Sequence, residues 1–272
     1  SISISINSIP SYNGKRTHRP RNLPPTWDRR RNRVDFLRTG EDVAQVELHC
    51  LYLHDGFDLP DRLLSEAERH RASAFRSADA RCLFVAGRIL CRSIIANLLG
   101  CTPQALSLAI TPSGRPYLRD YPDIDFNLSH TKDRVALAIC RGGRIGIDIE
   151  RIDAFSEEET REIMPMILSE QELNQVHRFD TRHRHDVFLA CWVQKEAALK
   201  CLSQGFLADP QSVMLAPGNA TFSGTWQLSG EPIFIRSGRI GGGESADFQW
   251  AVATSKAATT PLWRHHKNGI FY

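Results

Sequence analysis

The chain lacks several features that would place it in large classes of protein. No stretch of its 272 residues approaches 18 consecutive apolar residues, and residues 1–10 alternate serine with isoleucine, unlike the basic and apolar segments of a secretion signal. These absences predict a soluble, cytoplasmic protein without a membrane partner. The sequence has no G-x-G-x-x-G or Walker loop, so nothing in it supports a Rossmann or P-loop nucleotide site.

Cysteines are few and have no regular spacing. The seven are odd in number, scattered along the chain and never arranged as C-x-x-C. A disulfide framework needs pairs and a structural zinc site needs closely spaced ligands, so neither is predicted. The pattern is typical of a reducing cytosol.

The net charge of +3 is unevenly distributed along the chain. Residues 1–40 hold nine Lys and Arg but only two acidic residues, so the remainder is acidic overall. Together with its Ser, Pro and Asn content, this predicts a disordered basic leader over residues 1–44. A nucleic-acid-binding arm or a transit segment stays open as an alternative for the leader, but the acidic body favours a protein without a nucleic-acid partner.

The order of expected elements predicts an α+β fold of two similar α/β halves, each with a small, mainly antiparallel sheet and a long helix. The halves are placed at 45–143 and 144–256, with a tail at 257–272. S-x-x-E capping boxes mark three of the helix starts. Expected strands lie near 46–53, 106–110, 135–140, 145–149, 212–215, 232–236 and 247–253, and expected helices near 65–75, 79–99, 156–164, 170–178 and 184–203.

Two acids stand two residues apart in the segment G-I-D-I-E, residues 146–150. The β-branched neighbours predict a strand, which places Asp148 and Glu150 on one face with Cα atoms roughly 6 to 7 Å apart. Like charges at this spacing repel unless a proton or cation lies between them, and a hard divalent ion with oxygen ligands meets that need. The alternative is a half-exposed strand whose acids are solvated.

A second motif, W-V-Q-K-E-A-A-L-K, lies on the last expected long helix at residues 192–200. Four-residue spacing stacks Trp192, Glu196 and Lys200 on one face. Glu196 could then complete a three-carboxylate magnesium site or act as a base, while Lys200 neutralises a phosphate. An ordinary Glu-to-Lys helix pair beside a core tryptophan explains the same pattern.

Candidate anion-binding groups lie upstream of these motifs. Arg81, Arg88 and Arg92 fall within about 40° of one another on the expected helix 79–99, which forms either a clamp on a multiply charged anion or a solvated basic face. Two short motifs follow, G-R-P with Arg115 and F-N-L-S-H with Ser129 and His130. Their side chains can donate hydrogen bonds to phosphate.

Together the segments G-R-P, F-N-L-S-H, G-I-D-I-E and W-V-Q-K-E-A-A-L-K resemble, in order and approximate spacing, the Sfp-type 4′-phosphopantetheinyl transferase family. Four ordered motifs are more specific than any one of them. The resemblance implies two α/β halves related by a pseudo-twofold axis, with coenzyme A in the cleft between them. It also implies an enzyme that transfers phosphopantetheine from coenzyme A to a serine of an apo carrier protein and releases adenosine 3′,5′-bisphosphate. A monomer is expected, because a chain that already contains two halves has less need of a partner subunit.

The same resemblance assigns roles to individual residues. Asp148, Glu150 and Glu196 are implied to hold Mg²⁺, and Lys200 to lie near the pyrophosphate of coenzyme A. Residues of the arginine helix and of the two short motifs are implied to bind the nucleotide phosphates, namely Arg81, Arg88, Arg115, Ser129 and His130. Two alternatives stay open. The base that accepts the serine proton is either Glu196 or a metal-bound water, and Glu196 is either that base or a metal ligand.

Three other functions are compatible with parts of the sequence. A homologue that binds coenzyme A or a carrier protein without transfer would keep the fold, although the presence of all three carboxylates and Lys200 argues against it. A different magnesium-dependent phosphotransferase or hydrolase would use the same carboxylates. A nucleic-acid-associated protein would act through the leader and bind with a steep salt dependence.

Overall fold

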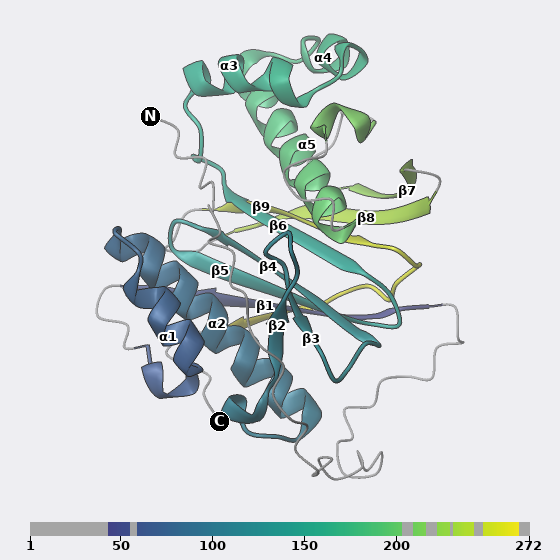
Figure 1. Ribbon diagram of the computed structural model, residues 1–272. Coiled ribbons are helices and arrows are strands. Elements are labelled where there is room, and N and C mark those ends of the chain that lie inside the picture. Colours follow the sequence, from purple (N-terminus) through teal and green to yellow (C-terminus); the bar gives the residue numbers. More distant parts are fainter. Residues whose placement is uncertain are drawn as a thin grey trace.

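The computed structural model describes residues 43–54, 59–202, 209–215, 222–228, 231–241 and 247–266. It confirms a mixed α+β fold, in which two four-stranded sheets each pack against a long helix (Figure 1). The predicted leader lies outside the described residues except for Val43 and Ala44.

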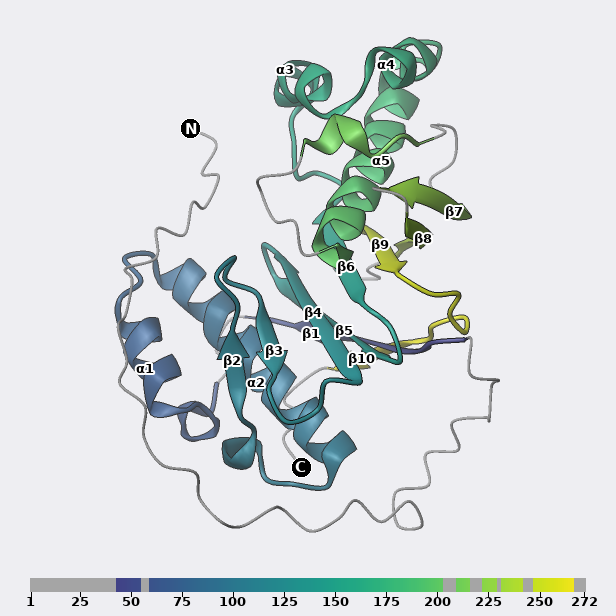
Figure 2. The same cartoon turned by 45° about the vertical axis from the view of Figure 1, so that its right-hand side comes forward.

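The first sheet has the strand order β10-β1-β5-β4. Its pairs are antiparallel except for β1 and β10, which run parallel. One face is covered by α2, with α1 alongside (Figure 2). The elements are β1 (Gln45–Tyr52), α1 (Glu66–Ser73), α2 (Ala78–Leu99), the hairpin β2 (Leu108–Ile110) with β3 (Pro116–Leu118), β4 (Ile124–Thr131), β5 (Arg134–Arg141) and β10 (Trp263–His266), with 3-10 turns at Asp61–Leu63 and Pro103–Ala105.

The second sheet has the strand order β6-β9-β8-β7 and is antiparallel throughout. α5 lies along one face of it, and α3 and α4 pack at the N-terminal end of α5 (Figure 1). The elements are β6 (Ile145–Arg151), α3 (Glu157–Ile167), α4 (Glu170–Val176), α5 (Thr181–Cys201), a 3-10 turn at Pro210–Ser212, β7 (Phe222–Leu228), β8 (Glu231–Ile240) and β9 (Phe248–Thr254).

Local capping chemistry fixes most helix starts where the sequence predicts them. Ser65, Ser156 and Ser169 each form a complete capping box with a glutamate three residues later. α5 begins three residues before the expected position because the Asp180 side chain accepts a hydrogen bond from the backbone of His183.

Among the described helices, α2 is long and apolar enough by length and composition to cross a bilayer. Most of that stretch is buried inside the protein, where its apolar side chains pack on the first sheet. The same test is passed by core helices of globular proteins, and α2 is packed as such a helix.

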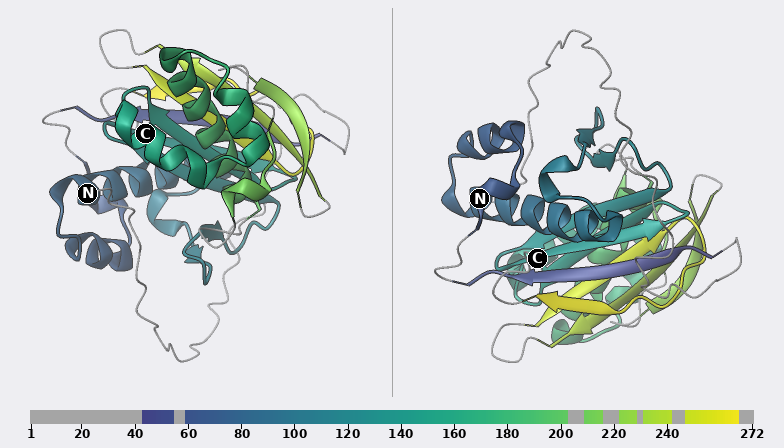
Figure 3. Two further views of the ribbon diagram at one scale, coloured as in Figure 1. Left: turned by 90° about the horizontal axis from the view of Figure 1, so that it is seen from above. Right: turned by 90° about the horizontal axis from the view of Figure 1, so that it is seen from below.

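The segment after α5 departs from the sequence prediction. The strand expected at 212–215 is wrong, because a 3-10 turn occupies Pro210–Ser212 and the carbonyls of Pro210 and Val213 accept hydrogen bonds from the buried Lys195 instead of from a neighbouring strand. Residues 263–266, predicted to lie in a tail outside both halves, form β10 along β1 of the first sheet (Figure 3). The C-terminal part of the described chain therefore crosses back to the first half.

The two sheets meet through an apolar core and a polar ladder. Small and branched residues of β1, β5, β6 and β9 form the core, with Ile145, Ile147 and Ile149 fully buried. Alternate side chains of β4 accept hydrogen bonds from alternate backbone N–H groups of β6 at a constant offset of 20 residues. The pairs are Asp125 to Ile145 at 2.8 Å, Asn127 to Ile147 at 2.9 Å, Ser129 to Ile149 at 3.3 Å and Thr131 to Arg151 at 3.4 Å. This ladder supplies hydrogen-bond acceptors to the backbone N–H groups on the edge of β6 that faces away from β9.

Candidate active site

The alternation of β6 separates its apolar and acidic side chains. The three isoleucines point into the core between the sheets, so Asp148 and Glu150 fall on the opposite face, toward α5. Asp148 is buried and Glu150 is half-buried. The structure confirms the prediction that the two carboxylates lie on one face of a strand.

Glycine at position 146 lets α5 lie directly on this face of β6. A Cβ atom there would lie 2.1 Å from the carbonyl oxygen of Ala197 and 2.4 Å from the backbone nitrogen of Cys201. The close approach brings the last turns of α5 over the acids. Lys200 Nζ then donates to Asp148 Oδ1 at 2.5 Å and to the Ile147 carbonyl at 3.3 Å.

The electrostatics of the site favour an additional positive charge. Burial, reinforced by the neighbouring charge of Asp148, raises the pKa of Glu150 to about 8. Burial also raises the pKa of Glu196. Burial alone would lower the pKa of Lys200, but Asp148 and Glu196 outweigh it and raise that pKa. Three acids thus surround a single lysine, and one oxygen, Asp148 Oδ2, is buried without a hydrogen-bond partner in the described structure.

A hard divalent cation fits this donor set, which consists of carboxylate oxygens alone. Among the described residues, no three His, Cys, Asp or Glu side chains already converge as metal ligands. Lys200 holds the other oxygen of Asp148. An ion bound through Asp148, Glu150 and Glu196 would meet Asp148 Oδ2, which has no partner in the described structure, whereas Oδ1 already accepts from Lys200 and Ser129.

Two residues predicted to bind phosphate are occupied by the protein itself. Ser129 is buried and donates to Asp148 Oδ1 at 2.8 Å. The guanidinium of Arg115 contacts the carbonyl of Lys200, the Ile145 carbonyl at 2.6 Å and Asp125 at 2.7 Å. Arg115 therefore connects the first half to β6 and α5. The phosphate-binding role of Arg115 and Ser129 stays a prediction.

His130 is the predicted phosphate ligand that reaches the rim of the carboxylate site. The residue lies at the end of β4, where part of it is exposed to solvent and part is covered by the surrounding protein. Burial lowers the pKa of the imidazole most, and the nearby Lys200 cation lowers it further. The Asp148 carboxylate raises this pKa and so opposes part of the shift. His130 is thus mainly neutral near pH 7 and can donate one N–H to an anion.

The arginine stripe on α2 divides into one exposed and two buried residues. Arg81 is exposed, with its nearest carboxylate, Asp61, 3.9 Å away. Arg88 is buried, with Glu68 at 4.0 Å and with Nη1 lacking a hydrogen-bond partner in the described structure. Arg92 is buried and donates to Glu68 at 2.7 Å, so its role is structural. The stripe is neither a uniform clamp nor a solvated face.

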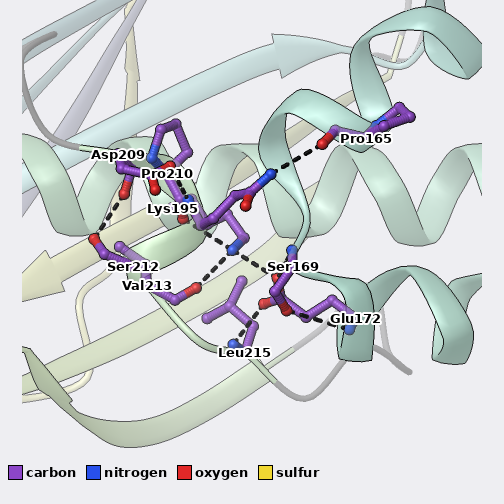
Figure 4. A network of polar contacts seen from close by, with 10 residues as sticks. Pro165, Ser169, Glu172, Lys195, Asp209, Pro210, Ser212, Val213 and Leu215 are labelled. Atoms are coloured by element: carbon purple, nitrogen blue, oxygen red, sulfur yellow. Dashed lines mark hydrogen bonds and ion pairs between the residues drawn. The ribbon is translucent and has the colours of Figure 1, made fainter.

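Lys195, next to Glu196 in the sequence, points away from the carboxylate site. Its ammonium is buried and donates to Glu172 at 2.8 Å and to the carbonyls of Pro210 and Val213 (Figure 4). Glu172 in turn accepts from the backbone nitrogen of Leu215 at 2.7 Å. This network ties α4 and the segment after α5 to the helix that carries Glu196 and Lys200.

Sequence reasoning missed the polar face of β4. The available signal was the alternation D-x-N-x-S-x-T at 125–131, which matches the alternation I-x-I-x-I-x-R at 145–151. Thr131 is the site residue found only through the structure, since its hydroxyl donates to Glu150 Oε2 at 3.1 Å.

Comparisons with known proteins agree with the two-part fold. Residues 144–253 match the sequence model of the 4′-phosphopantetheinyl transferase superfamily. Residues 54–141 match the model described as 4′-phosphopantetheinyl transferase, N-terminal. The two matches follow each other along the chain and include all four motifs.

Individual relatives give the same assignment. A putative 4′-phosphopantetheinyl transferase of Synechocystis sp. is 24% identical over 186 residues, which cover 65% of this chain and 75% of the relative. The 4′-phosphopantetheinyl transferase HetI of Nostoc sp. is 31% identical over 52% of this chain and 60% of its own length. The L-aminoadipate-semialdehyde dehydrogenase-phosphopantetheinyl transferase of Xenopus laevis is 30% identical over 53% of this chain and 51% of its own length.

The matched region thus spans from about half to three quarters of these curated relatives. With both family models matched in order, the chain belongs to the 4′-phosphopantetheinyl transferase superfamily of enzymes.

Proposed function

We propose that the protein transfers the 4′-phosphopantetheine arm of coenzyme A to a serine of an apo acyl, peptidyl or aryl carrier protein and releases adenosine 3′,5′-bisphosphate. One observation carries the proposal. Asp148 and Glu150 on β6 face Glu196 and Lys200 on α5, in a chain that matches the family across both parts. The proposal places coenzyme A in a cleft between two halves related by a pseudo-twofold axis, in a monomer.

Asp148, Glu150 and Glu196 would hold Mg²⁺, whose charge neutralises phosphate oxygens during phosphoryl transfer. The carboxylate-only donor set and the orphaned Asp148 Oδ2 support this assignment. Lys200 would place its ammonium near the pyrophosphate. Phosphoryl transfer needs such charge neutralisation and alignment more than covalent help from the protein.

Anion-binding groups at the rim would orient the nucleotide. His130 offers an N–H beside Lys200, and the exposed Arg81 and the unpartnered nitrogen of Arg88 lie along α2. The proposal leaves Arg115 and Ser129 as contacts within the protein, because their polar atoms already have partners there. Guanidinium groups suit the multiply charged phosphates of coenzyme A.

Glu196 as base is the alternative to Glu196 as a metal ligand, and in that role it would accept the proton of the carrier serine. Burial raises the pKa of this carboxyl, which makes its ionised form a stronger base than an exposed glutamate. The serine oxygen would then form a bond to the β-phosphorus of coenzyme A as the bond to the leaving nucleotide oxygen breaks. The serine proton ends on Glu196, and the leaving group departs as adenosine 3′,5′-bisphosphate.

The proposal is tested by incubating the protein with coenzyme A, Mg²⁺ and apo carrier proteins of several classes and recording the intact mass of each carrier. The expected result is a phosphopantetheine-sized gain with the wild type and a loss of that gain with Glu196→Gln. Coenzyme A binding without any gain on any carrier would instead support a non-catalytic homologue. Cleavage of coenzyme A with no modified carrier would indicate a hydrolase.

A further inference from the structure

The four side chains of the β4 ladder differ in what they can do beyond accepting an N–H. Asp125 and Asn127 accept through a carboxylate and an amide oxygen. Ser129 and Thr131 accept through hydroxyl groups. A hydroxyl that has accepted one hydrogen bond still carries a proton to donate, whereas an ionised carboxylate has none. Ser129 and Thr131 therefore each keep one hydroxyl proton that they can donate to a further acceptor.

Both spare protons are directed at the acids of β6. Ser129 Oγ donates to Asp148 Oδ1 at 2.8 Å, and Thr131 Oγ1 donates to Glu150 Oε2 at 3.1 Å. The two hydroxyl residues are 6% and 7% exposed. Each hydroxyl is thus fixed by a backbone N–H on one side and a carboxylate on the other, so its orientation is determined by the protein rather than by water.

The register of the ladder makes this arrangement repeat. Each hydroxyl bonds the N–H of one β6 residue and the carboxylate of the residue before it, first at Ile149 and Asp148, then at Arg151 and Glu150. The first half of the protein therefore determines where two carboxylates of the second half lie. The third carboxylate, on α5, receives no hydrogen bond from β4 in the described structure.

Carboxylates that share a cation must be held near one another before the cation arrives, against their mutual repulsion. Hydrogen bonds from outside the ligand set restrict the rotation of each carboxyl group and reduce this cost. Thr131 and Ser129 are placed to do so, one for each acid of the strand.

We propose that Thr131 and Ser129 are positioning residues, which hold Glu150 and Asp148 in the orientation needed to bind the divalent cation. The inference rests on the proposed function, because the cation matters through phosphopantetheine transfer. Neither hydroxyl contacts coenzyme A in this account, and their effect is transmitted through the two carboxylates.

The test compares Thr131→Val, which keeps the shape of the side chain and removes the hydroxyl, with Thr131→Ser, which keeps the hydroxyl. The probe is Mn²⁺ binding to the full chain, followed by the electron paramagnetic resonance signal of free Mn²⁺. Thr131→Val is expected to weaken Mn²⁺ binding by about 10-fold or more, as loss of other outer hydrogen bonds to metal ligands does. Thr131→Ser should bind Mn²⁺ like the wild type.

Thr160→Val is the matched control, because Thr160 is also buried and its hydroxyl also has a side-chain partner, His185. It removes a buried hydroxyl from α3, away from the carboxylates, and should leave Mn²⁺ binding unchanged. If Thr131→Val does not fold, as judged by circular dichroism, Ser129→Ala provides the same test at Asp148 without adding atoms. In the transfer assay, Thr131→Val should raise the Mg²⁺ concentration for half-maximal rate while the rate at saturating Mg²⁺ stays near that of the wild type.

The outcomes separate the inference from the proposed function. Wild-type Mn²⁺ affinity in a folded Thr131→Val protein would overturn the inference even if the wild type transfers phosphopantetheine. Absence of Mn²⁺ binding by the wild type would overturn it as well. Weakened binding in Thr131→Val, together with a wild type that modifies no carrier, would support the positioning role and refute the transfer.

Discussion

Replacing Gly146 with alanine is expected to displace α5 from β6. The added Cβ would lie 2.1 Å from the Ala197 carbonyl oxygen and 2.4 Å from the Cys201 nitrogen, whereas ordinary contacts begin at 3.4 Å. Both obstructing atoms belong to the helix backbone, so no side-chain rotation relieves the contact. The helix that carries Glu196 and Lys200 must therefore move away from the strand that carries the acids.

The size of the effect follows from the geometry of the contact. Overpacking a core costs typically 1 to 3 kcal/mol, and an obstruction by rigid backbone belongs at the upper end, so we expect a loss of about 3 kcal/mol in the free energy of unfolding. For a chain of this size such a loss lowers the melting temperature by roughly 6 to 12 °C. Transfer activity should fall further, because Glu196 and Lys200 on α5 move away from Asp148 and Glu150 on β6.

Gly87→Ala is the matched control in the first half of the protein. Its Cβ would lie 3.6 Å from Val135 and 3.9 Å from Leu128, which are ordinary contact distances, and Gly87 is inside α2. Because alanine favours a helix over glycine by about 1 kcal/mol, this variant should be as stable as the wild type or more stable.

Both variants are compared by chemical denaturation and by thermal melting. The reasoning predicts opposite or clearly unequal effects from the same chemical change at the two positions. A Gly146→Ala protein that melts with the wild type would refute the close approach of α5 to β6. Equal losses in both variants would refute the contrast between the two sites.

Three further predictions concern the surroundings of the site. Lys195→Met leaves the carboxylate of Glu172 buried without its cation and should lower the free energy of unfolding, measured by chemical denaturation, by about 3 to 5 kcal/mol. Lys256→Met, at an exposed lysine, should change it by less than about 0.5 kcal/mol. Equal effects of the two substitutions would contradict the Lys195 network. Arg115→Ala removes a guanidinium that joins both halves and should lower the free energy of unfolding by at least about 2 kcal/mol. An unchanged unfolding curve would show that these contacts do not hold the halves together. Because the pKa of Glu150 is raised from 4.5 to about 8, the folded metal-free protein binds a proton that the unfolded chain has lost between these pH values, and stability falls as pH rises across them. Mg²⁺ competes with that proton, so it should raise the melting temperature more at about pH 8.5 than at about pH 6, and equal shifts at both pH values would contradict the assignment.

Strong local patterns made much of the fold predictable from the sequence. The capping boxes at Ser65, Ser156 and Ser169 fixed three helix starts, because each is a short-range hydrogen-bond pattern. The two-residue spacing of Asp148 and Glu150 placed them on one face of the strand, because successive side chains of a strand point to opposite faces. Such features depend on neighbours in the sequence and on no distant contact.

The features that were missed depend on contacts between distant segments. No strand forms at 212–215, because the carbonyl of Val213, like that of Pro210 before it, accepts a hydrogen bond from Lys195, whose burial cannot be read from a helix pattern. The contacts of Arg115 with Asp125 and of Ser129 with Asp148 could not be read from the sequence either, and the phosphate-binding role of both residues stays a prediction. The role of Thr131 follows only from the alignment of β4 with β6.

The proposed transfer is tested most directly by measuring both products of one reaction. The protein is incubated with coenzyme A and an apo carrier protein, with Mg²⁺ or with a chelator, and modified carrier and adenosine 3′,5′-bisphosphate are quantified together. The account predicts that the two products form in equal amounts and only when Mg²⁺ is present. Nucleotide release without modified carrier, or modification that persists in the chelator, would contradict it.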